Sequence, residues 1–152
     1  MVDVPPEEAD EIAPHARDAG LDLIRLIAPT TDEARLPRVL AATTGFVYYV
    51  SITGITGTRS ASAEHLAEAV PRIRRHTGLP VAIGFGIRTP QQAAEAVRVA
   101  DAAVVASALI DTLAASLDEQ GNARPDTARL VLDQVRQLAE AVRGARKGAA
   151  AA

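Results

Sequence analysis

The chain has 152 residues, enough for one domain with a substantial core, and 48% of them are hydrophobic while 23% are charged. Its net charge of −3 argues against nucleic acid or an anionic membrane as a partner, and the absence of cysteine excludes disulfides and thiolate metal sites. The acidic start does not resemble a signal peptide, and no apolar run approaches the roughly 20 residues that span a bilayer. We therefore expect a soluble, cytoplasmic protein.

Helical and apolar segments alternate along the chain. A helix is expected from Pro5 to the glycine at position 20, with Pro14 kinking or splitting it. The expected strands are the apolar runs 21–28, 46–51, 79–85 and 102–107. Further helices are expected after Thr31 or Asp32, over 63–76, from the Thr89 cap over 90–100, and near 108–117. A final helix carries an apolar stripe of Val131, Val135, Leu138 and Val142.

The strands are continuous apolar runs without polar alternation, which indicates that both of their faces are buried. Parallel strands covered by helices meet that requirement, and the distances between strands suit right-handed crossovers. The predicted class is α/β, with one domain over 1–147 and a disordered tail over 148–152.

Small, flexible residues follow three consecutive strands, in the stretches SITGITG, GFGI and ASA. Ligands of such folds bind at the carboxyl ends of the strands, where glycine lets the backbone approach closely. Ser107 is expected to begin a short extra helix, whose N-terminus offers unpaired N–H groups. Together these features predict an anion site for phosphate.

Structural explanations exist for each of these residues. Gly84 and Gly86 suit close packing at the rim of a barrel, Gly54 and Gly57 suit plain turns, and Ser107 suits a helix cap. The convergence of all three stretches favours the phosphate site. The chain's histidines, expected to face solvent from helices, lack the spacing of metal ligands; they are His15, His65 and His76.

Four stretches resemble the tryptophan synthase alpha chain family: DVPPEE (3–8), FVYYVSITGITGTR (46–59), LPVAIGFGIRTPQQA (79–93) and VVASALI (104–110). That family is a TIM (β/α)₈ barrel that cleaves indole-3-glycerol phosphate to indole and glyceraldehyde 3-phosphate. The resemblance implies half of such a barrel, from the end of the fourth strand, in VDVP, to the eighth strand.

The resemblance also assigns a site. It places phosphate binding at the backbone or hydroxyl groups of Gly57, Gly86, Ala106 and Ser107. It places the substrate pocket at Tyr48, Thr56 and Gly84, with Thr56 at the working end of a loop that closes over substrate. Ala106 and Ala102 depart from glycines of the family, and alanine keeps the backbone N–H but not a positive φ.

By the same resemblance, the family's acid/base glutamate and indole-binding aspartate precede this chain. Retro-aldol cleavage calls for such paired carboxylates, and Asp3, the one carboxylate expected at a strand's catalytic end, is interpreted as structural. No catalytic residue, metal or cofactor is therefore expected in this chain, and pyridoxal phosphate would belong to a beta-chain partner.

Two functions remain open. The first is the phosphate-binding half of a lyase of tryptophan biosynthesis, inactive alone, with a sugar phosphate as ligand. The alternative is a non-catalytic half-barrel that binds a phosphate ligand or serves as an assembly piece. Four parallel strands leave two free edges, which predicts self-association.

Overall fold

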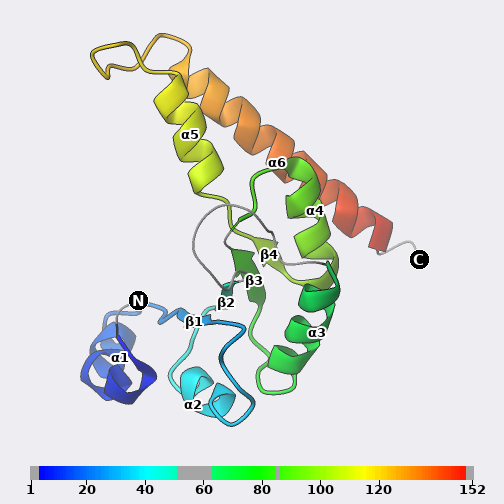
Figure 1. Ribbon diagram of the computed structural model, residues 1–152. Coiled ribbons are helices and arrows are strands. Elements are labelled where there is room, and N and C mark those ends of the chain that lie inside the picture. Colours follow the sequence, from blue (N-terminus) through cyan, green and yellow to red (C-terminus); the bar gives the residue numbers. More distant parts are fainter. Residues whose placement is uncertain (1–3, 51–62, 85, 150–152) are drawn as a thin grey trace.

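Four short parallel strands form one sheet in which each strand pairs with the next in the sequence (Figure 1). The computed structural model describes residues 4–50, 63–84 and 86–149. The strands are β1 (Arg25–Ile27), β2 (Val47–Val50), β3 (Val81–Gly84) and β4 (Ala102–Ala103). This order confirms the predicted α/β class and the parallel sheet.

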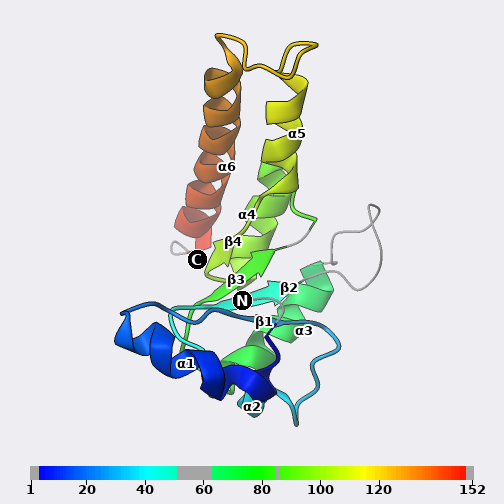
Figure 2. The same ribbon diagram turned by 90° about the vertical axis from the view of Figure 1, so that its left-hand side faces the viewer.

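Helices connect the strands, and further helices lie before the first strand and after the last. They are a short 3₁₀ turn η1 (Pro6–Glu8), α1 (Ala9–Asp18), α2 (Leu36–Leu40), α3 (Ala63–Arg74), α4 (Pro90–Val99), α5 (Ser107–Ala115) and α6 (Thr127–Ala149). Helices α5 and α6 run side by side as a hairpin that projects beyond the sheet, and we call residues 107–149 the arm (Figures 1 and 2). Near the sheet, α6 packs against α4.

The strands are shorter than the apolar runs that predicted them, above all in the last run, 102–107, where only the first two residues form a strand. A parallel strand lasts only as long as its neighbour offers backbone partners, and α5 already begins at Ser107. In the run 21–28, the Leu23 N–H donates to the Thr44 side chain, at 2.8 Å from Oγ1, and not to the backbone of a neighbouring strand. The strand β1 therefore begins only after this residue.

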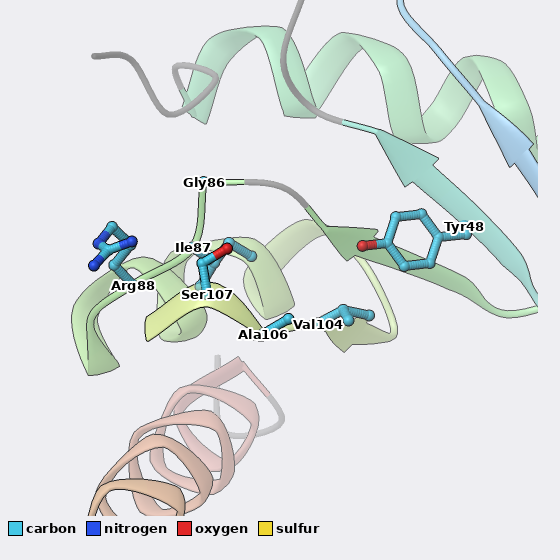
Figure 3. A pocket seen from close by; sticks show the side chains of 7 residues that line it. All are labelled: Tyr48, Gly86, Ile87, Arg88, Val104, Ala106 and Ser107. Atoms are coloured by element: carbon cyan, nitrogen blue, oxygen red, sulfur yellow. The ribbon is translucent and has the colours of Figure 1, made fainter. Parts of the chain in front are cut away.

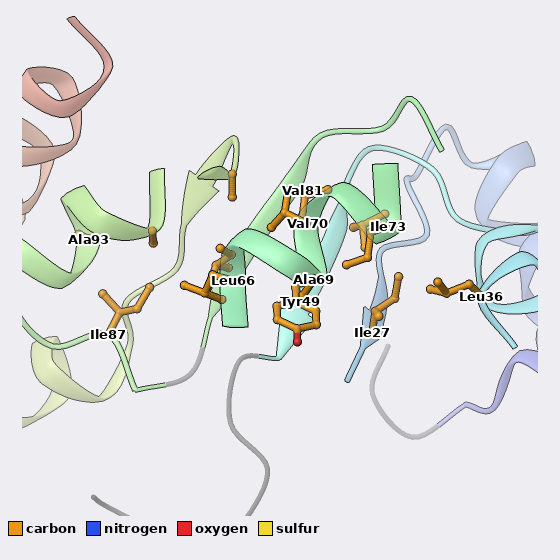
Figure 4. Packing of buried hydrophobic residues seen from close by; sticks show 14 of the residues in the cluster. Ile27, Leu36, Tyr49, Leu66, Ala69, Val70, Ile73, Val81, Ile87 and Ala93 are labelled. Atoms are coloured by element: carbon orange, nitrogen blue, oxygen red, sulfur yellow. The ribbon is translucent and has the colours of Figure 1, made fainter. Parts of the chain in front are cut away.

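The core lies between the sheet and the helices. Alternate strand residues, including Ile27, Tyr49 and Val81, point to the helix side, where α3 contributes an apolar stripe (Figure 4). The predicted inward face of α3, Leu66, Val70 and Ile73, is buried as expected.

The opposite face of the sheet, here the inner face, is only partly covered. Leu26, Tyr48 and Val50 are half-buried and Ala102 is exposed, whereas β3 is buried along its whole length. The expectation that every strand is buried on both faces is therefore wrong for β1, β2 and β4. The buried residues of α2, α3, α4 and α6 belong to the core on the other side of the sheet.

Some helix boundaries lie where the sequence predicted them and others do not. Thr89 caps α4 through a capping box with Gln92, and Pro90 is the first residue, as predicted. Pro14 does not split α1, which is continuous around it. Helix α6 runs on to Ala149, through the first two residues of the tail predicted to be disordered, and 150–152 lie outside the described residues.

Two long-range contacts hold the ends of the chain to the sheet. Arg25, only 2% exposed, donates from Nη1 to the Val4 carbonyl at 2.5 Å, which fixes the first described residue beside β1. At the other end, Arg146 of α6 donates to the carbonyl of Asp101. The Asp101 carboxylate in turn accepts the Val81 N–H at 2.8 Å and Arg74 Nη2 at 3.0 Å. Asp101 therefore joins β3, α3 and α6.

Candidate functional site

A cavity of about 160 Å³ lies at the carboxyl ends of β2, β3 and β4 (Figure 3). It is lined by Tyr48, Gly86, Ile87, Arg88, Val104, Ala106 and Ser107. Four of these are residues that the sequence placed in the phosphate site or the substrate pocket: Tyr48, Gly86, Ala106 and Ser107. Segments far apart in the chain thus meet at the edge of the sheet where ligands of α/β folds bind.

Gly86 turns the chain between β3 and α4 with a backbone conformation that other residues avoid. Its φ is +78°, in the left-handed region, where a Cβ atom is disfavoured. The glycine is therefore required by the backbone, whatever ligand the cavity holds.

Ser107 is the first residue of α5, and Ala106 precedes it as the N-cap without a side-chain hydrogen bond to the helix. Ser107 begins the helix as predicted. It is not the N-cap residue, so the alternative that it serves only as a helix cap is wrong. The first N–H groups of an α-helix lack partners within the helix and carry partial positive charge. Ala106 has φ −126°, so alanine in place of the family's glycine needs no left-handed backbone here.

Tyr48 and Gly84 lie on the inner face of neighbouring strands. The register pairs Tyr48 with Ala82 and Val50 with Gly84, so the Tyr48 ring leans across the end of β3. Its hydroxyl points toward the other lining residues in Figure 3. Burial raises the pKa of Tyr48, so it further favours the neutral phenol, which can donate a hydrogen bond.

The sequence reasoning missed Arg88. It follows Gly86 by two residues in the same loop, and a cation beside glycines at a strand end is a signal that the sequence did contain. The seven lining residues include no carboxylate. Two further predicted site residues, Thr56 and Gly57, lie outside the described residues, as does Asp3.

The described histidines lie away from this cavity. His65 Nε2 is 2.9 Å from the hydroxyl of buried Tyr49, on the helix side of the sheet. His76 follows α3 rather than lying within it, is 23% exposed in its side chain, and hydrogen-bonds to Glu33 at 2.7 Å. That hydrogen bond holds the pKa of Glu33 below its usual value. The expectation of solvent-facing helical histidines is therefore wrong for His76.

No group of three or more His, Asp or Glu side chains in the described ranges is placed to hold a metal ion. Over the same ranges, no helix is both long and apolar enough to cross a membrane.

A family model described as tryptophan synthase alpha chain matches residues 1–143. The chain belongs to the tryptophan synthase alpha chain family. It is 70% identical over 149 residues to the tryptophan synthase alpha chain of Granulibacter bethesdensis, covering 98% of this chain and 53% of that relative. It is 66% identical over 146 residues to the tryptophan synthase alpha chain of Gluconacetobacter diazotrophicus, covering 96% of this chain and 53% of the relative.

Solved structures of the family agree with the fold. The alpha subunit of tryptophan synthase from Legionella pneumophila superposes with a TM-score of 0.77 at 26% identity, over 95% of this chain and 51% of that one. A structure of Mycobacterium tuberculosis tryptophan synthase gives a TM-score of 0.75 at 34% identity, over 93% and 50%. The chain thus spans about half the length of the relatives it matches, and its sheet corresponds to half of the family's TIM barrel.

Proposed function

We propose that this chain is the phosphate-binding half of a lyase of tryptophan biosynthesis, which cleaves indole-3-glycerol phosphate to indole and glyceraldehyde 3-phosphate. The observation that carries the proposal is that left-handed Gly86 and the start of α5 at Ser107 line one cavity. Membership of the tryptophan synthase alpha chain family supports the choice of substrate.

In this proposal the phosphate is held mainly by the backbone. The Gly86 N–H and the first N–H groups of α5 donate to phosphate oxygens, and the Ser107 hydroxyl adds one more donor. Tyr48 lies beside the indole ring, and Gly84 leaves room for the Tyr48 ring. Thr56 and Gly57 remain predicted members of the same site.

The chemical step needs groups that this cavity does not supply. Retro-aldol cleavage requires a proton for the indole ring and removal of a proton from the glycerol hydroxyl, which is work for carboxylates. None of the described residues that line the cavity carries one. We therefore propose that the chain alone binds the phosphate end of the substrate without turning it over.

Calorimetric titration with glycerol 3-phosphate tests the phosphate site. Gly86→Asp places a negative charge close to the phosphate, and at about 4 Å with an effective dielectric of about 20 each unit-charge repulsion costs about 4 kcal/mol. Gly86→Asn is the matched control, because it imposes the same backbone strain without the charge. We expect Gly86→Asp to abolish binding and Gly86→Asn to retain part of it. Equal binding by all three proteins would show that the anion site is misplaced.

The open inner face favours a second candidate function. A half-barrel whose inner face is only partly covered at Leu26, Tyr48 and Val50 suits an assembly piece that a second half-barrel completes. Binding of glycerol 3-phosphate with micromolar to millimolar affinity separates the candidates, because an assembly piece without a ligand role would not bind it.

We also propose the tryptophan synthase beta chain as a partner and the cytoplasm as the compartment. Family membership supports the partner, and the cysteine-free sequence suits a reducing compartment. Pyridoxal phosphate would then be bound by the beta chain. Co-elution of this chain with a purified beta chain from a sizing column tests the partnership.

A further inference from the structure

Arg88 and Asp111 meet at the rim of the cavity. Arg88 comes from the loop between β3 and α4, two residues after Gly86, and its Nη2 donates directly to Asp111 Oδ2 on α5. The two side chains are 52% and 61% exposed, so both ends of this ion pair keep much of their water. Ion pairs of this kind are weak and exchange partners readily.

The positions of both residues are set by the elements that form the cavity. The Arg88 N–H donates to Gln92 Oε1 at 2.8 Å, which ties the Arg88 backbone to the start of α4. Asp111 follows Ser107 by four residues in α5, so the two lie on the same face of the helix, one turn apart. In Figure 3, Arg88 and Tyr48 mark opposite ends of the cavity, with Ser107 and Ala106 between them.

We propose that Arg88 is an additional ligand of the phosphate, held beside the cavity by Asp111 until a phosphomonoester binds. The proposal rests on the phosphate site proposed above. A phosphate dianion carries two charges and matches the guanidinium fork, whereas the Asp111 carboxylate carries one, so the dianion competes well for Arg88. Backbone N–H groups at a helix start supply only about half a unit of positive charge, and Arg88 supplies a full one.

This arrangement also sets the class of ligand. The described lining residues contain one cation and no anion, with Asp111 just outside them. A dianionic phosphomonoester gains more charge-assisted hydrogen-bond energy from Arg88 than a neutral polyol or a single carboxylate does. Arg88 therefore selects for the phosphate end of the substrate rather than for its glycerol part.

Calorimetric titrations with glycerol 3-phosphate test the inference in the full chain. We expect Arg88→Gln to weaken binding about ten-fold, as for loss of one charge-assisted hydrogen bond at a half-exposed site. Asp111→Asn should strengthen binding about three-fold, because it frees Arg88 and removes a nearby negative charge. In the double variant the gain from Asp111→Asn should shrink, since part of it acts through Arg88.

Arg136→Gln is the matched control, because Arg136 forms a similar exposed ion pair with Asp133 on α6, away from the cavity. It should leave the affinity within about two-fold. If Arg88→Gln binds glycerol 3-phosphate as tightly as wild type while Gly86→Asp still fails to bind it, Arg88 and Asp111 form a surface ion pair only. The phosphate site would then not depend on them. Weaker binding by Asp111→Asn would overturn the inference as well. If the unaltered chain binds no glycerol 3-phosphate, both proposals fall.

Discussion

The ring of Tyr48 occupies the space that any side chain at Gly84 would need. A Cβ atom at Gly84 would lie 1.9 Å from Tyr48 Oη and 2.2 Å from Cζ, far inside contact distance. The glycine that ends β3 and the one that follows it are therefore required for different reasons. Gly84 is required by packing against the aromatic ring of β2, and Gly86 by its own left-handed backbone.

Gly84→Ala should destabilise the protein by about 2 kcal/mol, because the Tyr48 ring must leave its place to admit the methyl group. Urea denaturation measures the change. In a Tyr48→Ala background the same substitution should cost far less, since the obstructing ring is gone. Equal costs in both backgrounds would mean that something other than Tyr48 limits this position.

The chain alone should not release indole from indole-3-glycerol phosphate. In the proposed function the described lining residues bind the phosphate, but they include no carboxylate to move the two protons of the reaction. An indole-release assay on purified chain measures this. Turnover well above background that Gly86→Asp abolishes would show that another group performs the proton transfers at this site.

The chain should self-associate, because the inner face of its sheet is only half-covered and, among the described strands, β1 and β4 each pair on one side only. The arm adds exposed apolar side chains: Ile110, Leu113, Leu132 and Val135. Light scattering behind a sizing column should give a mass that rises with concentration. Leu26→Lys, on the inner face, should lower that mass, whereas Leu21→Lys should not, because Leu21 follows α1 and lies outside the sheet. A monomer at every concentration would contradict an open half-barrel.

Asp101→Asn should lower the free energy of unfolding by about 1 kcal/mol at neutral pH, a modest value because the carboxylate is 41% exposed. Partial burial opposes ionisation, but the Val81 N–H and Arg74 outweigh it and lower the pKa of Asp101. The stabilisation is then complete above the ordinary carboxyl pKa of about 4 and is lost as the pH falls through the lower folded value.

Urea unfolding of both proteins over a pH series checks this. The gap in stability between wild type and Asp101→Asn should vanish at acidic pH, open as the pH rises toward about 4, and stay constant above it. Asp10→Asn, on the exposed side of α1, is the control and should change stability by less than about 0.5 kcal/mol. A constant gap at all pH values would rule out the ionised carboxylate as the source of the stabilisation.

The sequence predicted those features that depend on neighbours along the chain. Thr89 and Pro90 predicted the start of α4, and Ser107 predicted the start of α5. The apolar stripe of α3 predicted which of its faces is buried. Gly86 and Ser107, both singled out in the sequence, line one cavity, because parallel strand ends meet at one edge of a sheet.

Features that depend on residues far apart in the chain could not be predicted from local sequence patterns. The length of β4 depends on how far β3 can pair with it. The ion pair of Arg88 with Asp111 joins residues that are separate in sequence and close only in the fold. The half-open inner face follows from the side of the sheet on which the helices pack, which an apolar strand does not specify.

Helix α5 begins in the cavity and ends near the tip of the arm, where the Thr127 hydroxyl donates to the Ser116 carbonyl at 3.0 Å. Along α6, Leu138 is buried in the core while Leu132, nearer the tip, is 60% exposed. The outer part of the arm therefore leaves large apolar side chains exposed and is joined at its tip by polar contacts, so it should exchange its amide hydrogens through local opening rather than global unfolding.

Any such opening that reaches the first turn of α5 also removes the Ser107 wall of the cavity. A solute bound at that wall must then slow amide exchange along α5, at a distance from every atom it contacts. Closing of the arm and binding in the cavity are in this way thermodynamically coupled, so that a change in one shifts the other.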